Sequence, residues 1–555
     1  MAAPEGAYDL VVIGTGWYGL GSAKEYIQLH PHEKILILES GQYCGGTWSK
    51  DRLYPGLHSN NLWGSYEFPD FPMTEEEYGV REGQHVPADV LHRYLTDFAK
   101  HFGIFERTRF NTRVNVVEAA NDGWVLHTTG SEPIRTSKLI VATGLTSTPN
   151  LPTYPGSETF GPPLFHAKDF YKRAKILETC DRAVVVGAGK SAYDIAYAFA
   201  TAKATVDLLI RPTGQGPVWL CPPYVTPLKR KLEELIATRF FSWMSPCPWQ
   251  WDDGHTWAHW FLQGTRIGRI IVNKFWNIIS DEVVDTFGFN KDKELAKLKP
   301  WNIAKWTGSA VGIHNFPTNF FDLVKQGRIR VHIAEIDRLE GSTVHLSNGE
   351  RFETDAVVCA TGWKKASELK FIGFDTGLAQ SPAEVNRLSK IADKHVLEMF
   401  PLLRDQPKFE VDIRPADPMR NYRFIVPSKA IFKGNIAFAG MVSAVTTAIF
   451  STVQGLWISA YFDGKLQRMP ETDDEVLQEI MLHTQFEKWR YPCGYGASLP
   501  DFAFDCILYA DMLVNDLGLN CHRKGTYIRE VFEAYKPRDY KGLSQEWAKK
   551  YGREE

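Results

Sequence analysis

The chain of 555 residues has few cysteines, and none of them is spaced to pair with another or to hold zinc. Eight cysteines are scattered between Cys44 and Cys521, without a C-x-x-C pair or a cluster at zinc-ligand spacing. A disulfide scaffold and a structural zinc site are therefore not expected. His255 and His259 lie four residues apart, but HTWAH lacks the glutamate of the H-E-x-x-H metal motif, so no metal site is expected there either.

An excess of charge of either sign is also lacking. The 63 lysine and arginine residues nearly balance 66 aspartate and glutamate residues, which leaves a formal net charge of −3. Such a balance gives no general attraction to nucleic acid or to an anionic membrane, so neither is an expected partner. The first residues lack the basic and apolar regions of a secretory signal, and we expect a cytoplasmic protein.

A charge-free stretch covers residues 435–462, but its composition does not favour a membrane span. It contains Ser443, Thr446, Thr447, Ser451, Thr452, Gln454 and Gly455. A bilayer helix needs about 20 predominantly apolar residues. We therefore predict a buried strand at residues 436–439, a turn and a core helix.

Two segments share the order strand, glycine turn, helix, strand. The first begins with the apolar run at residues 8–13, continues through GTGWYG and a helical pattern to Gln28, and returns in the run KILILES. The second covers residues 182–211, where RAVVV leads into GAGKSA. Two such βαβ units predict an α/β fold with two Rossmann-like dinucleotide-binding domains. Residues 127–144 and 328–362 each contain strands that end in Ala-Thr-Gly, which predicts a small antiparallel meander beside each parallel sheet.

The first glycine turn has the spacing that a bound dinucleotide requires. Gly14 permits the tight turn, Gly16 lets the backbone approach a pyrophosphate, and Gly19 allows the helix to pack closely on the strand. Thr15 lies within the turn, and Glu39 ends the next strand, where a carboxylate can accept hydrogen bonds from ribose hydroxyls. These five residues are the predicted first dinucleotide site.

The second glycine turn contains Gly-Lys-Ser but is not a Walker loop, because the residue five positions before Gly189 is valine. Arg211 follows the next strand, one position short of the place of the acid in the first unit. A guanidinium there suits a 2′-phosphate better than ribose hydroxyls. Gly187, Gly189, Lys190, Ser191 and Arg211 are therefore predicted to bind NADPH in preference to NADH, and the first site is predicted to bind FAD.

Further motifs accompany the two turns. They are Gly45-Gly46-Thr47-Trp48 and Ala360-Thr361-Gly362. A segment between the turns is similar to FxGxxxHxxx(F/Y), with Phe160, His166 and Phe170 in place, although Pro162 stands at the glycine position and Gly161 lies one residue early. With these motifs the chain resembles the class B flavin-containing monooxygenases, over most of its length except the Trp-rich segment and the last hundred or so residues.

The resemblance implies a discontinuous FAD-binding domain, built from residues 1–165 and 330–555. The NADPH-binding domain would be inserted at residues 166–329 and would include a helical, Trp-rich insertion at about 217–310. The resemblance also implies cofactor contacts for Gly46, Thr47, Trp48, Thr361 and Gly362.

Two adjacent asparagines are candidates for a catalytic role. Asn60, in SNNLWGSYEFPDFP, stands where the family has a flavin-side asparagine that donates a hydrogen bond. Asn61 fills the same role after a shift of one residue, so both remain candidates. His166 is predicted to be a structural hydrogen-bonding residue rather than an acid or base.

The implied chemistry is hydride transfer from NADPH to flavin, addition of O₂, and delivery of one oxygen atom from a flavin C4a-hydroperoxide to a small-molecule substrate. The product would be a nitrogen or sulfur oxide or a hydroxylated compound, and an ester from Baeyer–Villiger oxidation of a ketone is the alternative. The Baeyer–Villiger fingerprint ends in Trp, so Phe170-Tyr171 favours the first outcome.

Two other classes of protein compete with this interpretation. A disulfide reductase would need a redox cysteine pair after the first unit, where the chain has only Cys44. A non-catalytic Rossmann scaffold that binds a protein partner would not need the second glycine turn.

The segment at residues 217–310 is rich in tryptophan, from Trp219 to Trp301, and does not follow the βαβ order. Its aromatic residues either only pack the insertion onto the body or form a substrate lid, a membrane-surface patch or a subunit contact. They also suggest a bulky apolar substrate, such as a secondary metabolite. The sequence does not indicate an oligomeric state.

Overall fold

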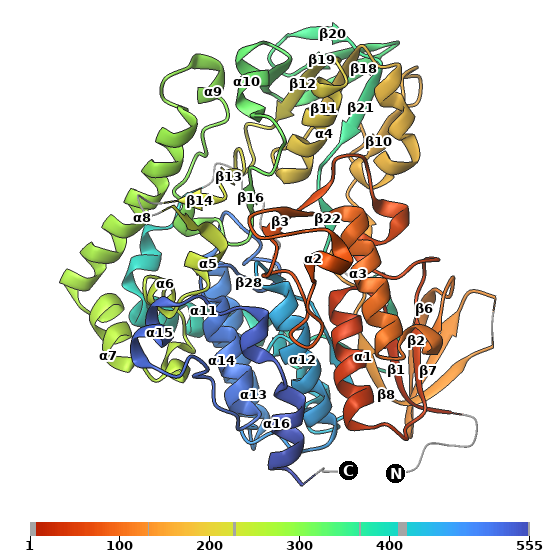
Figure 1. Ribbon diagram of the computed structural model, residues 1–555, viewed down its shortest axis with the longest axis vertical. Helices are drawn as coiled ribbons and strands as arrows, with labels where there is room; N and C mark the ends of the chain where they lie inside the picture. The colour runs from red at the N-terminus through yellow and green to blue at the C-terminus, as the bar shows by residue number, and fades with distance from the viewer. Residues whose placement is uncertain (1–6, 131, 226–228, 366–367, 409–418, 553–555) are drawn as a thin grey trace.

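The computed structural model describes residues 7–130, 132–225, 229–365, 368–408 and 419–552. Figure 1 shows a first sheet with its helices, in red and orange, at the lower right of the molecule, and a second sheet in yellow and teal above it. Green helices run along the opposite side, and blue C-terminal helices pack between them and the first sheet. The two-sheet α/β architecture expected from the sequence is confirmed.

The first sheet has eight strands in the order β23-β6-β7-β8-β1-β2-β5, with β26 paired to β8. The bounds are β1 (Tyr8–Ile13), β2 (Ile35–Leu38), β5 (Thr108–Arg109), β6 (Val114–Ala120), β7 (Gly123–Thr128), β8 (Ile134–Val141), β23 (Lys370–Ile372) and β26 (Ile436–Phe438). β1 lies between β2 and β8 and is parallel to both. Parallel strands covered on both faces read as continuous apolar runs, which is why LVVI and ILIL are buried throughout.

β8 belongs to two parts of this sheet. Its first residues pair with β7 in the antiparallel meander β6-β7-β8, whereas its last residues pair in parallel with β26 and β1. The second region repeats the arrangement with a three-stranded antiparallel sheet of β18 (Ile336–Glu340), β19 (Thr343–Leu346) and β20 (Arg351–Glu353). Both expected meanders are confirmed.

The second sheet consists of five parallel strands in the order β10-β21-β11-β12-β17. They are β10 (Leu164–His166), β11 (Arg182–Val186), β12 (Thr205–Ile210), β17 (Ile329–Ile333) and β21 (Ala356–Cys359). The sequence placed the return to the first domain at residue 330. Strand pairing corrects that boundary, because β17 extends the edge at β12 and β21 lies between β10 and β11, so residues 329–359 stay with the second sheet.

Helix α1 (Trp17–Leu29) crosses α12 (Thr447–Phe462) with the two backbones in close contact. A Cβ on Gly21 would lie 2.5 Å from the carbonyl oxygen of Ser451, and a Cβ on Gly455 would lie 2.9 Å from the carbonyl oxygen of Gly21. Gly455, in the charge-free stretch, is therefore a packing residue, which joins the C-terminal part of the chain to the first βαβ unit.

The charge-free stretch itself forms β26, a turn and α12, as the sequence predicted. Residues 448–462 of α12 are buried on all sides by protein. In the part of the chain that the structure describes, no helix is both long and apolar enough to cross a membrane.

The insertion begins and ends on a pair of parallel strands, β13 (Trp219–Cys221) and β16 (Val311–Ile313). Between them lie β14 (Tyr224–Val225), β15 (Arg230–Lys231), α5 (Leu232–Ile236), α6 (Arg239–Trp243), α7 (Thr256–His259), α8 (Arg266–Phe287) and α9 (Lys293–Ala296). Its tryptophans divide into a buried group of Trp219, Trp243, Trp249, Trp276 and Trp306 and an exposed group of Trp251, Trp257, Trp260 and Trp301.

Other elements complete the layers. They are α2 (Glu75–Tyr78), α3 (Ala88–His101), α4 (Lys190–Thr201), α10 (Phe320–Lys325), α11 (Pro382–Met399), α13 (Asp473–Arg490), α14 (Cys506–Asp516), α15 (Tyr527–Phe532) and α16 (Leu543–Lys550), with β3 (His58–Leu62), β4 (His85–Pro87), β9 (Thr148–Pro149), β22 (Trp363–Lys364), β24 (Asn421–Tyr422), β25 (Val426–Pro427), β27 (Ser443–Ala444) and β28 (Asp501–Phe502).

Candidate active site

The first glycine turn connects β1 to α1 and leaves an open face at the start of the helix. Gly14 has a φ of +106°, and a Cβ there would overlap the carbonyl oxygen of Ala142. A Cβ on Gly19 would overlap the carbonyl oxygen of Gly14. A Cβ on Gly16, which precedes α1, would have only the Cα of Gly46 nearby, at 3.7 Å. Packing thus requires two of the glycines, whereas the third keeps space free where the N–H groups of a helix start can bind an anion.

Glu39 lies beside this turn at the end of β2. Its Oε2 accepts hydrogen bonds from the backbone N of Thr15 at 3.0 Å and from the Oγ1 of Thr15 at 2.7 Å. Its Oε1 accepts from the backbone N of Gly41 at 2.8 Å. These bonds fix the carboxylate at the glycine turn, where the sequence placed the ribose-binding acid.

The segment Gly46-Thr47-Trp48 approaches the same turn from the other side. Gly46 has a φ of +59°, and a Cβ there would lie 2.9 Å from the Cα of Gly16. Trp48 donates its indole N–H to the hydroxyl of Tyr66 at 3.0 Å, and Thr47 is exposed beside it. The predicted residues of the first site therefore lie around the first glycine turn. We call each of the two glycine turns, with the open helix start beside it, a cradle.

The second glycine turn, between β11 and α4, repeats this geometry. Gly187 has a φ of +146°, and a Cβ there would lie 2.5 Å from the carbonyl oxygen of Ala360. Gly189 precedes α4, and a Cβ there would have no atom within 4 Å. In both units the first glycine contacts the alanine of an Ala-Thr-Gly strand end, Ala142 or Ala360. This contact gives a physical reason why the Ala-Thr-Gly pattern occurs after a strand in both units.

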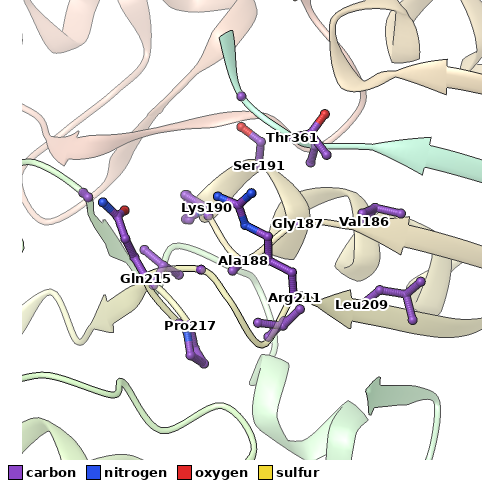
Figure 2. A pocket seen from close by; sticks show the side chains of 18 of the residues that line it. Val186, Gly187, Ala188, Lys190, Ser191, Leu209, Arg211, Gln215, Pro217 and Thr361 are labelled. Carbon is purple, nitrogen blue, oxygen red and sulfur yellow. The ribbon is translucent and has the colours of Figure 1, made fainter. Parts of the chain in front are cut away.

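A cavity of about 630 Å³ borders the second turn (Figure 2). Its lining includes all the predicted residues of the second site and of the late Ala-Thr-Gly motif, namely Gly187, Gly189, Lys190, Ser191, Arg211, Thr361 and Gly362. The insertion and the C-terminal region complete the lining, with Trp219, Trp301, Ser309 and Tyr495 among its residues.

The two cations of the second site have different surroundings. Lys190 forms an ion pair with Asp194, one turn later on α4, and donates to the Oδ1 of Asn315 at 2.8 Å. Arg211 is the first residue after β12 and is exposed, and Figure 2 shows its side chain extending into the cavity toward Lys190 and Ser191. Because Lys190 is held by two partners, Arg211 is the better placed cation for a phosphate in the cavity.

Two linkers join the sheets and pair with each other as β9 and β22. His166 holds this crossing: its Nδ1 accepts from the backbone N of Lys168 at 3.1 Å, so its Nε2 donates to the carbonyl oxygen of Gly362 at 2.9 Å. Burial lowers the pKa of His166, so the ring is neutral. Thr361 donates its hydroxyl to the carbonyl oxygen of Asn150, on the other linker, at 2.5 Å. The expectation that His166 is structural agrees with these bonds.

The two candidate asparagines on β3 have different partners, as expected for neighbours on a strand. Asn61 donates its side-chain N–H to the Oε2 of Glu233 at 3.1 Å and to the carbonyl oxygen of Val445 at 3.3 Å. Asn60 is exposed, and its Oδ1 accepts from the backbone N of Ile313 at 3.4 Å. The amide N–H of Asn61 is thus occupied by protein groups, whereas Asn60 is exposed and contacts β16 through its Oδ1.

Sequence reasoning missed Glu233, which fastens β3 to the insertion. Both carboxylate oxygens accept from the backbone N of Leu62, at 3.1 Å each, in addition to the bond from Asn61. Burial raises the pKa of Glu233 to about 7, although these hydrogen bonds oppose the shift. In the sequence LKRKLEELI this residue has the same appearance as the ordinary helical charge Glu234, so no signal distinguished it.

Asp501 was also missed, and it holds the wall of the cavity. It accepts from the backbone N of Ser309, at 2.7 Å, and from the backbone N of Tyr495, at 2.8 Å. Burial raises the pKa of Asp501 to about 6. The insertion and the C-terminal region are therefore joined at the cavity by one buried carboxyl group.

Comparison with known proteins identifies the family. A family model described as pyridine nucleotide-disulphide oxidoreductase matches residues 11–240. The FAD-dependent monooxygenase rstn6 of Aspergillus nomiae is 33% identical, over 97% of this chain and 98% of its own. The chain belongs to the FAD-dependent monooxygenases. Another such enzyme, from Pyrenophora dematioidea, is 32% identical over 94% of this chain and 100% of its own.

A solved structure shares the fold of this monooxygenase. Cyclohexanone monooxygenase from Rhodococcus sp. Phi1, bound to NADP⁺, superposes with a TM-score of 0.60 at 16% identity, over 92% of this chain and 97% of that chain. The resemblance to flavin monooxygenases seen in the sequence is confirmed.

The disulphide chemistry in the name of the family model has no counterpart in the cysteines of this monooxygenase. All eight cysteines are buried and unpaired. Burial raises the pKa of Cys44, the cysteine that follows the first unit, to about 12, so its thiol is not the thiolate that redox exchange needs.

Proposed function

We propose that this protein uses FAD and NADPH to insert one oxygen atom of O₂ into a bulky apolar small molecule, by oxidising nitrogen or sulfur or by hydroxylation. The observation that carries the proposal is the pair of glycine cradles. In each, the first glycine is pressed against an alanine carbonyl, and the middle glycine leaves the helix start open. Two dinucleotides fit this arrangement, one on each sheet.

FAD fits the first cradle. The open start of α1 at Gly16 would receive its pyrophosphate, and Glu39 would accept hydrogen bonds from its ribose. Thr15 holds that carboxylate in place, and Gly46 with its neighbours Thr47 and Trp48 would cover the cofactor from the other side. Bound flavin would accept a hydride from NADPH and supply the chemistry that activates O₂.

NADPH fits the second cradle. Gly187 and Gly189 leave the start of α4 open for a pyrophosphate, with Ser191 in the first turn. Arg211 would form a charge-assisted bond with the 2′-phosphate that distinguishes NADPH from NADH. A solved protein of the same fold is bound to NADP⁺, which supports the assignment.

Asn60 is the residue that we assign as hydrogen-bond donor on the flavin side. Its amide group is exposed between β3 and β16, whereas the amide of Asn61 is occupied by Glu233 and Val445. Asn61 would act as a positioning residue that keeps β3 in place. Donors that are fixed before the reaction stabilise developing charge without reorganisation.

A Baeyer–Villiger oxidation is the second candidate reaction. Solved cyclohexanone monooxygenases share the fold, which favours this alternative, whereas the fingerprint ends in Phe170-Tyr171 rather than in Trp. Phe170 is fully buried between Tyr54 and Phe199. The two reactions differ in product, so the substrate screen below separates them.

The test is NADPH oxidation by the FAD-loaded protein with a panel of bulky amines, sulfides, phenols and ketones under ¹⁸O₂. Hydrogen peroxide is followed in parallel. The proposal predicts substrate-dependent NADPH oxidation and one ¹⁸O atom in an oxide or phenol product. An ester that forms only from ketones would establish the second candidate. No labelled product from any class, together with no flavin reduction, would favour the non-catalytic scaffold.

A further inference from the structure

Trp301 differs from the other cavity-lining tryptophan of the insertion in its exposure. Its side chain is 42% exposed, whereas Trp219 is 3% exposed. Trp301 lies in the segment between α9 and β16, and the neighbouring residue Asn302 accepts a hydrogen bond from the indole N–H of Trp219 at 3.0 Å. The backbone that carries Trp301 is therefore anchored to β13, while its own ring remains open to the cavity.

One face of the Trp301 ring rests on the loop that follows β12. A Cβ on Gly216 would lie 2.5 Å from Cδ2, 2.7 Å from Cγ and 2.9 Å from Cε3 of this indole. Cδ2 is the nearest atom, and its two bonded neighbours, Cγ and Cε3, are only slightly farther away, so the Cβ position lies above Cδ2. The backbone of Gly216 therefore packs against the ring face and not against its edge. Gly216 has a φ of +83°, and this conformation without a side chain permits the contact.

Arg211 rests on the same loop, two residues from this contact. A Cβ on Gly214 would lie 3.0 Å from the Nε of Arg211. Gln215, between the two glycines, donates its side-chain N–H to the carbonyl oxygens of Pro492 at 3.4 Å and of Gly494 at 3.3 Å. Figure 2 shows Arg211 and Gln215 at the cavity. The loop thus contacts the side chain of Arg211 at Gly214 and the ring of Trp301 at Gly216, and Gln215 holds it to the C-terminal region.

A flat aromatic ring with one covered face and one accessible face is a stacking platform for another planar ring. Aromatic side chains stack on nucleobases through this kind of surface, and an adjacent guanidinium adds attraction for a phosphate. Arg211 marks the ribose 2′ side of the bound dinucleotide, and the base attached to that ribose is adenine. We infer that Trp301, contributed by the helical insertion, is the stacking platform for the adenine of NADPH.

This inference rests on the proposed function, because it assumes that the cavity binds NADPH. It gives the insertion a role in binding the cofactor, which is separate from any contact with the substrate. It also separates two kinds of recognition on one loop. Trp301 would bind the base of either nicotinamide cofactor, and Arg211 would bind only the phosphate that NADPH has in addition.

The test uses two fragments that lack nicotinamide and differ only in the 2′-phosphate, 2′,5′-ADP and 5′-AMP, titrated by calorimetry into the FAD-loaded protein. The wild type should bind 2′,5′-ADP more tightly than 5′-AMP. Trp301→Leu should weaken both by a similar factor, on the order of 5- to 150-fold, and leave their ratio unchanged. Arg211→Ala should weaken 2′,5′-ADP alone.

Three more variants control for folding and for the aromatic face. Trp301→Phe keeps a π-face and should stay within a few-fold of the wild type. Trp301→Gln should reproduce Trp301→Leu, so a folding defect in one leaves the other usable. Trp257→Ala removes an insertion tryptophan that is 61% exposed and does not line the cavity, and it should bind both fragments as the wild type does.

The outcomes distinguish the inference from the function on which it rests. If Trp301→Leu binds 2′,5′-ADP normally while Arg211→Ala does not, Trp301 is not the platform and the NADPH site stands. If Trp301→Leu weakens NADP⁺ but not 2′,5′-ADP, the ring stacks on nicotinamide and the inference is wrong. If the wild type binds neither fragment nor NADP⁺, the proposed second site itself fails.

Discussion

Replacing Glu233 with glutamine should change how the stability of this protein depends on pH. Glu233 lies in the first turn of α5, and burial raises its pKa to about 7. An unfolded glutamate titrates near 4.3. The folded protein therefore binds a proton that the unfolded chain has released, so the stabilising contribution is present at low pH and is lost as the pH rises through about 7.

The size of the effect follows from the shift. The gap between about 4.3 for the unfolded chain and about 7 for the folded protein limits the effect to about 3.7 kcal/mol, at about 1.36 kcal/mol for each pH unit. Partial contact with solvent reduces this figure to about 2 to 3 kcal/mol. Glu233→Gln cannot ionise but keeps an oxygen that accepts from Leu62 and Asn61. Relative to the wild type, this variant should therefore gain about 2 to 3 kcal/mol in unfolding free energy between about pH 5 and about pH 8.5.

Urea unfolding of the FAD-loaded wild type and variant, followed by tryptophan fluorescence across this pH range, measures the difference. Glu234→Gln is the matched control on the same helix. Burial raises the pKa of Glu234, but the ammonium groups of Lys536 and Lys231 outweigh burial and the net shift is downward. The control should lose stability by an amount that does not vary above about pH 5. A flat difference for Glu233→Gln as well would mean that Glu233 ionises normally, and the reasoning would be refuted.

Four further substitutions test the cavity, the flavin side and the core. Arg211→Ala should raise the apparent KM for NADPH about 10- to 100-fold and leave that for NADH nearly unchanged in steady-state assays, because one charge-assisted bond is lost; equal effects on both would make Arg211 structural. Asn60→Leu should retain anaerobic flavin reduction by NADPH but release more hydrogen peroxide per NADPH consumed, and normal coupling would remove Asn60 from the flavin side. Gly189→Val should fold normally, since a Cβ there has no atom within 4 Å, yet block flavin reduction by NADPH in stopped-flow traces. Gly21→Val should lower the unfolding free energy by about 3 kcal/mol or more, because its Cβ would lie 2.5 Å from the carbonyl oxygen of Ser451, and an unchanged urea midpoint would contradict the packing of α1 on α12.

The glycine turns were predictable because physical contacts fix their spacing. Gly14 and Gly187 are each in contact with an alanine carbonyl of the neighbouring strand, and no side chain fits there. The acid at Glu39 and the cation at Arg211 follow from the end of a strand, which an apolar run locates well. These features are local in sequence, so the sequence alone was sufficient to place them.

The domain boundary and part of the site were not predictable in this way. The strands at residues 329–333 and 356–359 have the same apolar pattern whichever sheet they join, and only pairing with β12 and β11 assigns them. The roles of Glu233 and Trp301 depend on contacts with residues 171 and 85 positions earlier, Leu62 and Gly216. No local pattern in the insertion encodes those contacts, so the sequence presented both residues as ordinary.

Anaerobic mixing of the purified, FAD-reconstituted protein with NADPH tests the central claim most directly. The claim is that the first sheet binds FAD and the second sheet binds NADPH, which reduces that flavin. It predicts a yellow protein that releases FAD on denaturation, loses its visible flavin absorbance on addition of NADPH, does so more slowly with NADH at low concentration, and regains its colour when O₂ is admitted. A protein that cannot bind FAD, or whose bound flavin keeps its colour with NADPH, would contradict the account.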